Sequence, residues 1–288
     1  MKVLKFGGTS VGSPQRMMQV GEILSSIKGQ KIVVLSAVSG NTNQLVSISQ
    51  KCKEEDKAGA IELANKMRSG FDQFFAELYK GEEYRAESES YVNQVFDDIL
   101  GLIDQPYSPQ IDKMLVIQGE LMSTRLFTNF LKDQGEDATL LMAQDFMTLD
   151  ANNEPDMSMI GKKLQHFLKK NTSQTMITQG FITRNAAGGI DNLQRGGSDY
   201  SATIIGAVLQ AEEVQIWTDI DGMHNNDPRV VEKTFPLAKL SFEEASELAY
   251  FGAKVLHPSC IVPAQMHEVP VRIKNTMDPG AHGTLISA

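Results

Sequence analysis

The sequence predicts an α/β protein, a three-layer αβα sandwich around a mostly parallel central sheet. Two observations support this fold class. Apolar runs of strand length alternate with longer segments of helical periodicity, which is the order of a chain that crosses over between parallel strands. The run IVVL at residues 32–35 is apolar at every position, as expected of a strand that is covered on both faces.

The N-terminal elements follow from local signals. Residues 3–6 are predicted to form a short strand that ends at a pair of glycines. Ser13 and Pro14 then open a helix, because serine caps helix N-termini and proline fits the first helical position. A second strand is expected within residues 31–38, and the polar stretch 36–44 is interpreted as a loop.

The chain from about residue 45 to residue 135 carries apolar residues at helical spacing among many charges. We expect helices there at residues 53–78, 84–103 and 111–131. Later strands are expected at residues 138–142, 175–182, 214–218 and, as the last one, 269–273, with helices at 200–209 and 242–251. No repeat or Gly/Ser linker divides the chain, so residues 1–288 are expected to form one domain, with a boundary between two lobes near residues 195–212.

Composition excludes several classes of protein. The chain has 288 residues, of which 41% are hydrophobic and 22% charged, as is typical of a soluble globular enzyme. Its 27 Lys and Arg against 36 Asp and Glu give a net charge of −9, so nucleic acid is not expected as a partner. No apolar run approaches the roughly 20 residues that cross a bilayer, and the N-terminus reaches glycine too early for a signal peptide.

Cysteine and histidine usage indicates neither a disulfide framework nor a metal site. Cys52 and Cys260 stand alone, and the five histidines have no ligand spacing. We therefore expect no metal ligands, no membrane partner and a reducing, cytoplasmic location.

The segment KFGGTS at residues 5–10 is a first candidate for an anion site. A strand end followed by two glycines lets backbone N–H groups approach an anion closely, and Lys5 could reach a phosphate as a point charge. Gly7 and Gly12 have the P-loop spacing, but Ser-Pro follows where Lys-Ser/Thr is required, and the dinucleotide motif is also absent. Taken alone, two glycines of this kind are more often a structural turn.

The segment RGGSD at residues 195–199 is a second candidate. The Arg195 guanidinium could hold a carboxylate in two hydrogen bonds. The competing interpretation is that Ser198 or Asp199 merely caps the helix that follows.

Two further pieces could belong to a site. WTD at residues 217–219, followed by DPR at 227–229, suits the nucleotide edge of an open α/β sheet, or simply a polar loop. Glu120 within a helical segment and Lys254 are candidate charged groups, although each alone could be a solvated charge.

In this order along one chain, the pieces resemble the aspartokinases of the amino acid kinase family. The resemblance covers nearly the whole chain. The matching stretches are KFGGTSVG (5–12), residues 36–42, GELMST (119–124), QGF (179–181), RGGSDYSA (195–202), WTD (217–219), DPRV (227–230), AKVLHP (253–258) and NTMDPGAHGTLI (275–286).

The resemblance implies the amino acid kinase (carbamate kinase-like) fold and a reaction. ATP, with Mg²⁺, would phosphorylate the side-chain carboxylate of L-aspartate to give 4-phospho-L-aspartate, the first step toward lysine, threonine and methionine. A carboxylate nucleophile is already ionised at pH 7, so positioning and charge neutralisation are the expected means of catalysis. The alternatives are a catalytically weak module that binds ATP and an amino acid, or a kinase for a related acidic amino acid.

The resemblance also implies residue roles. Lys5, Arg195 and Asp199 are expected to be catalytic. Arg195 would hold the substrate α-carboxylate, and Glu120 and Asp199 its ammonium group. The pocket would be completed by Ser36, Thr42, Phe181 and Ser198. The ATP site would be formed by Lys5, Gly7, Gly8, Thr9, Ser10, Thr218, Asp219, His224, Arg229 and Lys254.

Two departures from the family pattern stand out. Gln194 occupies the position where the family usually has glycine, and His224 the position where a tyrosine commonly lies against the nucleotide. We expect altered ATP contacts at His224 but no loss of a charged group.

Finally, the resemblance implies an organisation of the chain. An amino-acid lobe would cover about residues 1–200 and a nucleotide lobe about 201–288. No ACT domain, and therefore no lysine or threonine feedback site, is expected within these residues. Members of the family usually assemble as dimers or larger, so a homodimer is a candidate assembly.

Overall fold

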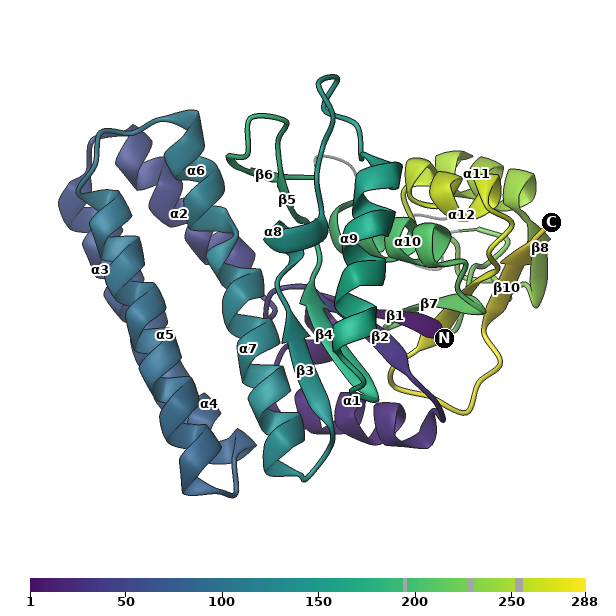
Figure 1. Cartoon of the computed structure of the whole chain (residues 1–288), viewed down its shortest axis with the longest axis horizontal. Coiled ribbons are helices and arrows are strands. Elements are labelled where there is room, and N and C mark those ends of the chain that lie inside the picture. Colours follow the sequence, from purple (N-terminus) through teal and green to yellow (C-terminus); the bar gives the residue numbers. More distant parts are fainter. Residues whose placement is uncertain (194–195, 227–229, 252–255) are drawn as a thin grey trace.

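The computed structural model describes residues 1–193, 196–226, 230–251 and 256–288. Within these ranges, eight strands form one sheet in the order β3-β4-β2-β1-β7-β9-β10-β8, with helices on both faces (Figure 1). The strands are β1 (Lys2–Phe6), β2 (Lys31–Leu35), β3 (Ala138–Leu141), β4 (Thr175–Gln179), β7 (Glu213–Thr218), β8 (Lys239–Ser241), β9 (Val271–Asn275) and β10 (Thr284–Ser287). A separate hairpin consists of β5 (Ile182–Arg184) and β6 (Ile190–Asn192).

The sheet is mostly parallel. Strands β9 and β10 pair antiparallel, and the other neighbouring pairs in the described sheet are parallel. Every residue of β2 is buried, including the aliphatic stem of Lys31. The predicted fold class, an αβα sandwich around a mostly parallel sheet, is confirmed.

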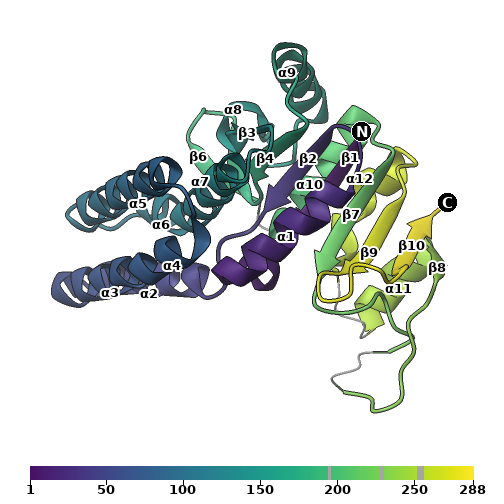
Figure 2. The ribbon, with the colours of Figure 1, turned by 90° about the horizontal axis from the view of Figure 1, so that it is seen from below.

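Side chains that alternate along the strands enter two different cores. Leu4 and Phe6 belong to the core on one face, together with helix α1 (Pro14–Ser26) and α7 (Gln118–Asp133). Val3 belongs to the core on the other face, with α9 (Met157–Lys170) and α10 (Gly197–Leu209). In Figure 1, α1 lies below the strands and α10 above them, and α1 crosses in front of the strands in Figure 2.

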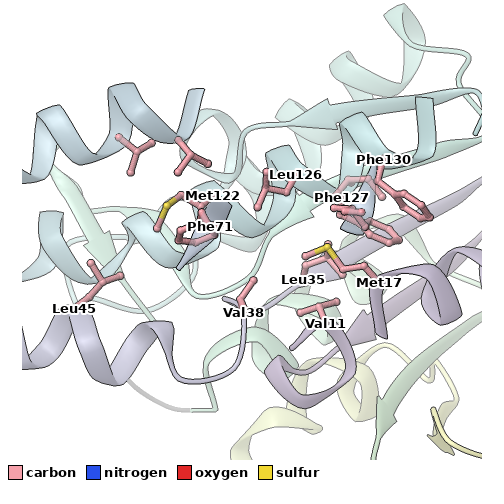
Figure 3. Close-up of a cluster of buried hydrophobic side chains, with 14 of the residues drawn as sticks. Val11, Met17, Leu35, Val38, Leu45, Phe71, Met122, Leu126, Phe127 and Phe130 are labelled. Atoms are coloured by element: carbon pink, nitrogen blue, oxygen red, sulfur yellow. The ribbon is translucent and has the colours of Figure 1, made fainter. Parts of the chain in front are cut away.

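Five helices project from one side of the sheet as a helical arm (Figures 1 and 2). They are α2 (Asn41–Lys53), α3 (Lys57–Ser69), α4 (Phe71–Leu78), α5 (Glu82–Ile103) and α6 (Pro109–Val116). The arm shares one core with the sheet: Phe71 of the arm, Met122 and Phe127 of α7, and Leu35 of β2 belong to a single buried cluster (Figure 3). This continuity ties the arm to the strands that carry the site.

Several local predictions are confirmed at the residue level. The Ser13 hydroxyl accepts a hydrogen bond from the Arg16 backbone N–H at 3.3 Å, and Pro14 occupies the first helical position.

At the centre of the sheet, the Phe6 ring stacks on Trp217 with centroids 5.5 Å apart. The Lys274 ammonium lies 4.9 Å from the centroid of the Trp217 ring.

Other boundaries were predicted wrongly. The polar loop after β2 is shorter than expected, because α2 begins at Asn41. The predicted helix 53–78 is two helices that meet at Gly70, a residue with no side chain to stabilise the helix. The predicted helix 111–131 is also two helices, α6 and α7, joined at Ile117.

The strand predictions need two corrections. The predicted strand 175–182 is interrupted after Gln179, because the backbone turns at Phe181 with φ of 70° before β5 begins. Residues 269–273 are not the last strand, since β10 follows β9 and returns antiparallel to it. The predicted helix 242–251 is confirmed as α11 (Phe242–Phe251). The elements not anticipated are α8 (Ala143–Phe146), α9, α12 (Val262–Met266) and strands β5, β6, β8 and β10. Among the described residues, no helix combines the length and apolar character that a bilayer crossing requires.

Candidate active site

A cavity of about 490 Å³ opens at the carboxyl ends of β1, β2 and β4. Carboxyl ends of parallel strands meet at one edge of a sheet, which is where open α/β proteins place ligands. Elements distant in sequence converge there: the short helix Gly8–Val11 after β1, the turn after β2, α7 and the N-terminus of α10. The cavity is lined by Lys5, Gly8, Thr9, Ser36, Ala37, Val38, Ser39, Gly40, Thr42, Asn43, Glu120, Phe181, Gly196, Gly197 and Ser198.

Lys5, which lines the cavity, forms an ion pair with Asp199. The Lys5 ammonium lies 2.6 Å from the Asp199 carboxylate, and the two side chains are 12% and 18% exposed. Lys5 comes from the end of β1, whereas Asp199 lies in the first turn of α10, where the helix dipole also favours a negative charge. The pair is shielded enough to be a stronger interaction than a surface ion pair.

The turn before α10 brings Ser198 into the lining of the cavity. The N-cap is Gly196, with φ of 66° and no side-chain capping bond. The alternative in which Ser198 or Asp199 caps this helix is therefore wrong. Instead, the Ser36 hydroxyl donates to the Ser198 hydroxyl at 2.9 Å.

Close backbone approaches shape the two walls. A Cβ at Gly180 would lie 2.3 Å from the Ser198 Cβ and 2.7 Å from its Cα, so only glycine lets the end of β4 meet α10. A Cβ at Gly8 would lie 3.0 Å from the Ala37 carbonyl oxygen. The glycine turn after β1 is thus packed directly against the turn after β2.

Glu120 forms the floor of the cavity. It lies in the first turn of α7 and is only 5% exposed, and its Oε2 atom has no hydrogen-bond partner among the residues that the structure describes. Burial raises the pKa of the Glu120 carboxyl to about 7, although the backbone N–H groups of Glu120 and Ala37 partly oppose the shift. A buried acid with an unpaired oxygen is suited to receive a cation from a ligand.

The remaining predicted pocket residues lie around this floor. Thr42 lines the cavity from the first turn of α2, and Phe181 lines it from the bend between β4 and β5. The Phe181 backbone N–H donates to the Ser201 hydroxyl at 2.9 Å, which fixes the bend against α10. Ser201 was not predicted as a site residue, although it lies within the RGGSDYSA motif.

The predicted phosphate turn has its own internal contacts. The Ser10 backbone N–H donates to the Gly7 carbonyl at 2.9 Å, and the wholly buried Ser10 hydroxyl lies 2.8 Å from the Thr276 hydroxyl. The backbone N–H and the hydroxyl of Ser10 therefore both have protein partners. Gly8 and Thr9 are the residues of this turn that line the cavity beside Lys5.

The predicted nucleotide edge lies beyond the end of β7. The Thr218 hydroxyl donates to the Asp219 carboxylate at 3.2 Å. His224 is buried, with Nδ1 2.9 Å from the Thr234 hydroxyl and Nε2 2.6 Å from the Asp221 carboxylate. Both ring nitrogens thus have protein partners, which the comparison with tyrosine did not anticipate.

Four positions singled out in the sequence lie outside the described residues: Gln194, Arg195, Arg229 and Lys254. In the part of the chain that the structure describes, no group of three or more His, Cys, Asp or Glu side chains could hold a metal ion.

Comparison with known proteins places the chain in a family. The family model described as "Amino acid kinase family" matches residues 1–275. The chain belongs to the amino acid kinase family. Within it, this amino acid kinase is similar to lysine-sensitive aspartokinase 3 of Escherichia coli, with 33% identity over 99% of this chain and 63% of that protein. It is 34% identical to the chloroplastic aspartokinase 3 of Arabidopsis thaliana, over 99% of this chain and 52% of that one.

Solved structures give the same fold. The structure of E. coli aspartokinase III in complex with aspartate and ADP has a TM-score of 0.88 and 32% identity, covering 100% of this chain and 64% of that one. The uridylate kinase of Archaeoglobus fulgidus shares the fold at a TM-score of 0.53 and 12% identity, covering 99% of both chains. This amino acid kinase spans about half to two thirds of the length of the single-function aspartokinases it resembles.

Proposed function

We propose that this amino acid kinase transfers the γ-phosphoryl group of ATP to the side-chain carboxylate of L-aspartate, giving 4-phospho-L-aspartate. One observation carries the proposal: a single cavity is lined by Lys5, which pairs with Asp199, by a glycine turn and by the buried Glu120, whose Oε2 atom has no hydrogen-bond partner among the described residues. The similarity to an aspartokinase solved with aspartate and ADP agrees with it.

The proposed chemistry needs no general base. One oxygen of the aspartate side chain forms a bond to the γ-phosphorus while the bond to the bridging oxygen of ADP breaks, and ADP takes that electron pair. Because the nucleophile is already ionised, the protein must mainly align two anions and offset their repulsion. Lys5 is placed to do this beside Gly7, Gly8 and Thr9.

The amino-acid end of the substrate is proposed to bind at Glu120 and Ser198. The ammonium group of aspartate would pair with Glu120 and draw that carboxyl into its ionised form, with Asp199 as a second negative charge. The hydroxyls of Ser36, Thr42 and Ser198 and the ring of Phe181 would complete the pocket, and Arg195 would bind the α-carboxylate.

The nucleotide is proposed to lie along the edge formed by Thr218 and Asp219, with His224, Arg229 and Lys254 nearby. Ser10 would then stabilise the phosphate turn without contacting the nucleotide, because its backbone N–H and its hydroxyl already have protein partners. Mg²⁺ would arrive with ATP and offset part of the phosphate charge, since this ion usually keeps several waters and few protein ligands.

The wider organisation is proposed on the same basis. Residues 1–288 would act as one catalytic domain, with an amino-acid lobe over about residues 1–200 and a nucleotide lobe over 201–288. A cytoplasmic location is proposed from the two isolated cysteines, and a homodimer from the resemblance.

Activity and substrate can be tested together. The purified protein is incubated with ATP, Mg²⁺ and hydroxylamine, which traps an acyl phosphate as a hydroxamate, and with aspartate, glutamate or no amino acid. ADP release is measured in parallel. We expect hydroxamate and ADP with aspartate only. Nucleotide binding, measured separately by calorimetry, without aspartate-dependent ADP release would support a non-catalytic binding module. Hydroxamate with glutamate would identify a different substrate.

A further inference from the structure

We propose that Thr276 is a positioning residue that fixes the phosphate turn after β1 against the nucleotide edge after β7. Thr276 directly follows β9 and is wholly buried. It lies 266 positions from Ser10 in the sequence. This inference rests on the proposed function, because it assigns a role within the nucleotide site.

Each polar group of Thr276 forms a hydrogen bond with a different segment around the proposed nucleotide site. Its hydroxyl lies 2.8 Å from the Ser10 hydroxyl of the phosphate turn. Its backbone N–H donates to the Thr218 carbonyl at 2.8 Å, and its carbonyl accepts from the Gln19 side chain of α1 at 2.8 Å. Thr276 thus joins the turn, the end of β7 and helix α1.

The sheet explains why one residue can reach all three. Strands β1, β7 and β9 are parallel neighbours, with Phe6 paired to Trp217 and Trp217 to Lys274. Their carboxyl ends stop at the same edge, so the residues that leave them lie side by side. The Ser10–Thr276 contact spans β7 and closes this row.

The Ser10–Thr276 contact matters because it is a directional hydrogen bond between two buried hydroxyls. If Thr276 lost its hydroxyl, the Ser10 hydroxyl would be left buried without this partner, a state that costs more than the bond itself contributes. The turn could recover a partner only by shifting, which would move Gly8, Thr9 and Lys5 relative to Thr218. The expected result is weaker binding of the nucleotide and little change in binding of the amino acid.

The test uses ADP and the full chain. Dissociation constants for Mg–ADP are measured by calorimetry for the wild type, Thr276→Val, Thr276→Ser and Ser10→Ala, alongside KM for ATP and aspartate. We expect Thr276→Val to weaken ADP binding by about tenfold and to raise KM for ATP while leaving KM for aspartate unchanged. Thr276→Ser, which keeps the hydroxyl, should restore both values.

A double variant separates support from direct contact. If Ser10 acts through Thr276, the variant with both Ser10→Ala and Thr276→Val should be no weaker than the worse single variant, because the two changes remove one interaction. Additive losses, with Ser10→Ala the larger, would mean that Ser10 itself touches the phosphates and would overturn the proposal. If Thr276→Val does not fold, the test rests on Ser10→Ala and Thr276→Ser. A tenfold loss of ADP affinity in Ser10→Ala together with normal ADP binding in Thr276→Ser supports the proposal. Any other pair of results overturns the proposal.

A matched control exists on the other side of the sheet. The Thr139 hydroxyl of β3 lies 2.6 Å from the Ser173 hydroxyl, so Thr139→Val removes another hydroxyl pair, a partly buried one, far from the site. It should lower thermal stability without changing ADP binding. If Thr276→Val behaves like Thr139→Val, its role is structural only and the inference fails. If the wild type itself does not bind Mg–ADP, the proposed function fails, and the inference with it.

Discussion

Glu120 is a buried carboxyl group, and burial makes its ionised form unfavourable. Ionising it therefore lowers the stability of the fold. Its pKa is raised by burial to about 7, from 4.5 for a solvated glutamate, so the folded protein binds more protons than the unfolded chain between these pH values. The contribution of this carboxyl to the free energy of unfolding is fully present below pH 4.5, and it is lost as the pH rises through 7. The loss is of the order of about 3 kcal/mol.

Glu120→Gln should therefore stabilise the ligand-free fold at alkaline pH. An amide stays neutral, so the difference in free energy of unfolding between variant and wild type should grow by about 2–3 kcal/mol from pH 5 to pH 8. Urea unfolding at both pH values measures it. Glu62→Gln, on an exposed position of α3, serves as the control and should show no such growth. The same Glu120→Gln variant should lose aspartate binding, and equal stability curves for it and the wild type would contradict the argument.

Lys5 should be essential for turnover. Lys5→Met removes the cation proposed to offset the charge of the transferring phosphoryl group, so kcat should fall by about 10²–10³. Lys2→Met provides a control in the same strand, because Lys2 pairs with Glu212 at 3.7 Å at the opposite end of β1. Steady-state kinetics of both variants distinguish the cases: a normal kcat in Lys5→Met would refute the assigned role.

For single residues, the sequence predicts which ones line the cavity better than it predicts their hydrogen-bond partners. Lys5, Ser36, Thr42, Glu120, Phe181 and Ser198 do line one cavity. Most of them were recognisable because they lie next to a glycine or a strand end, whereas Thr42 came only from the family resemblance. The partner hydroxyl of Ser10 was not predictable, since Thr276 lies 266 positions away and nothing in its local sequence points to the contact.

The junction between β4 and α10 is the element on which the pocket depends. Gly180→Ala should force the end of β4 away from Ser198, because the new Cβ would lie 2.7 Å from the Ser198 Cα, a backbone atom that cannot rotate aside. We expect a destabilisation of about 1–3 kcal/mol and a raised KM for aspartate.

Gly101→Ala offers a matched comparison. Gly101 lies within α5, and a Cβ there would meet nothing within 4 Å. This change should stabilise the protein by about 0.5–1 kcal/mol with unchanged kinetics. Thermal unfolding and aspartate kinetics of the two variants measure the contrast, and similar effects at both glycines would remove the argument for a close approach at Gly180.

Elements were predicted best where the chain is apolar and continuous. The strands β1, β2, β3 and β7 followed from short buried runs, and α1 from its capping serine and its proline. The sequence did not indicate that 175–182 would be interrupted, because Phe181 adopts a positive φ that is unusual for a bulky residue and is held by the Ser201 hydroxyl. The antiparallel return of β10 depends on pairing with β9, which is a tertiary contact.

At the scale of the whole molecule, the helical arm and the sheet are continuous. One buried cluster runs from Phe71 and Phe96 in the arm to Leu35 and Trp217 in the sheet. We therefore expect urea unfolding to be cooperative across both: far-UV circular dichroism and tryptophan fluorescence should report the same midpoint. An earlier loss of helical signal would show instead that the arm unfolds by itself.

Trp217 has a practical consequence. It is the single tryptophan of the chain, it lies at the middle of the sheet between Phe6 and Lys274, and the next residue is Thr218 of the proposed nucleotide edge. The protein thus carries one intrinsic optical probe at the strand where ATP is proposed to bind. Quenching of its emission during a nucleotide titration would give affinities without any label, and stopped-flow recording of the same signal would give association rates.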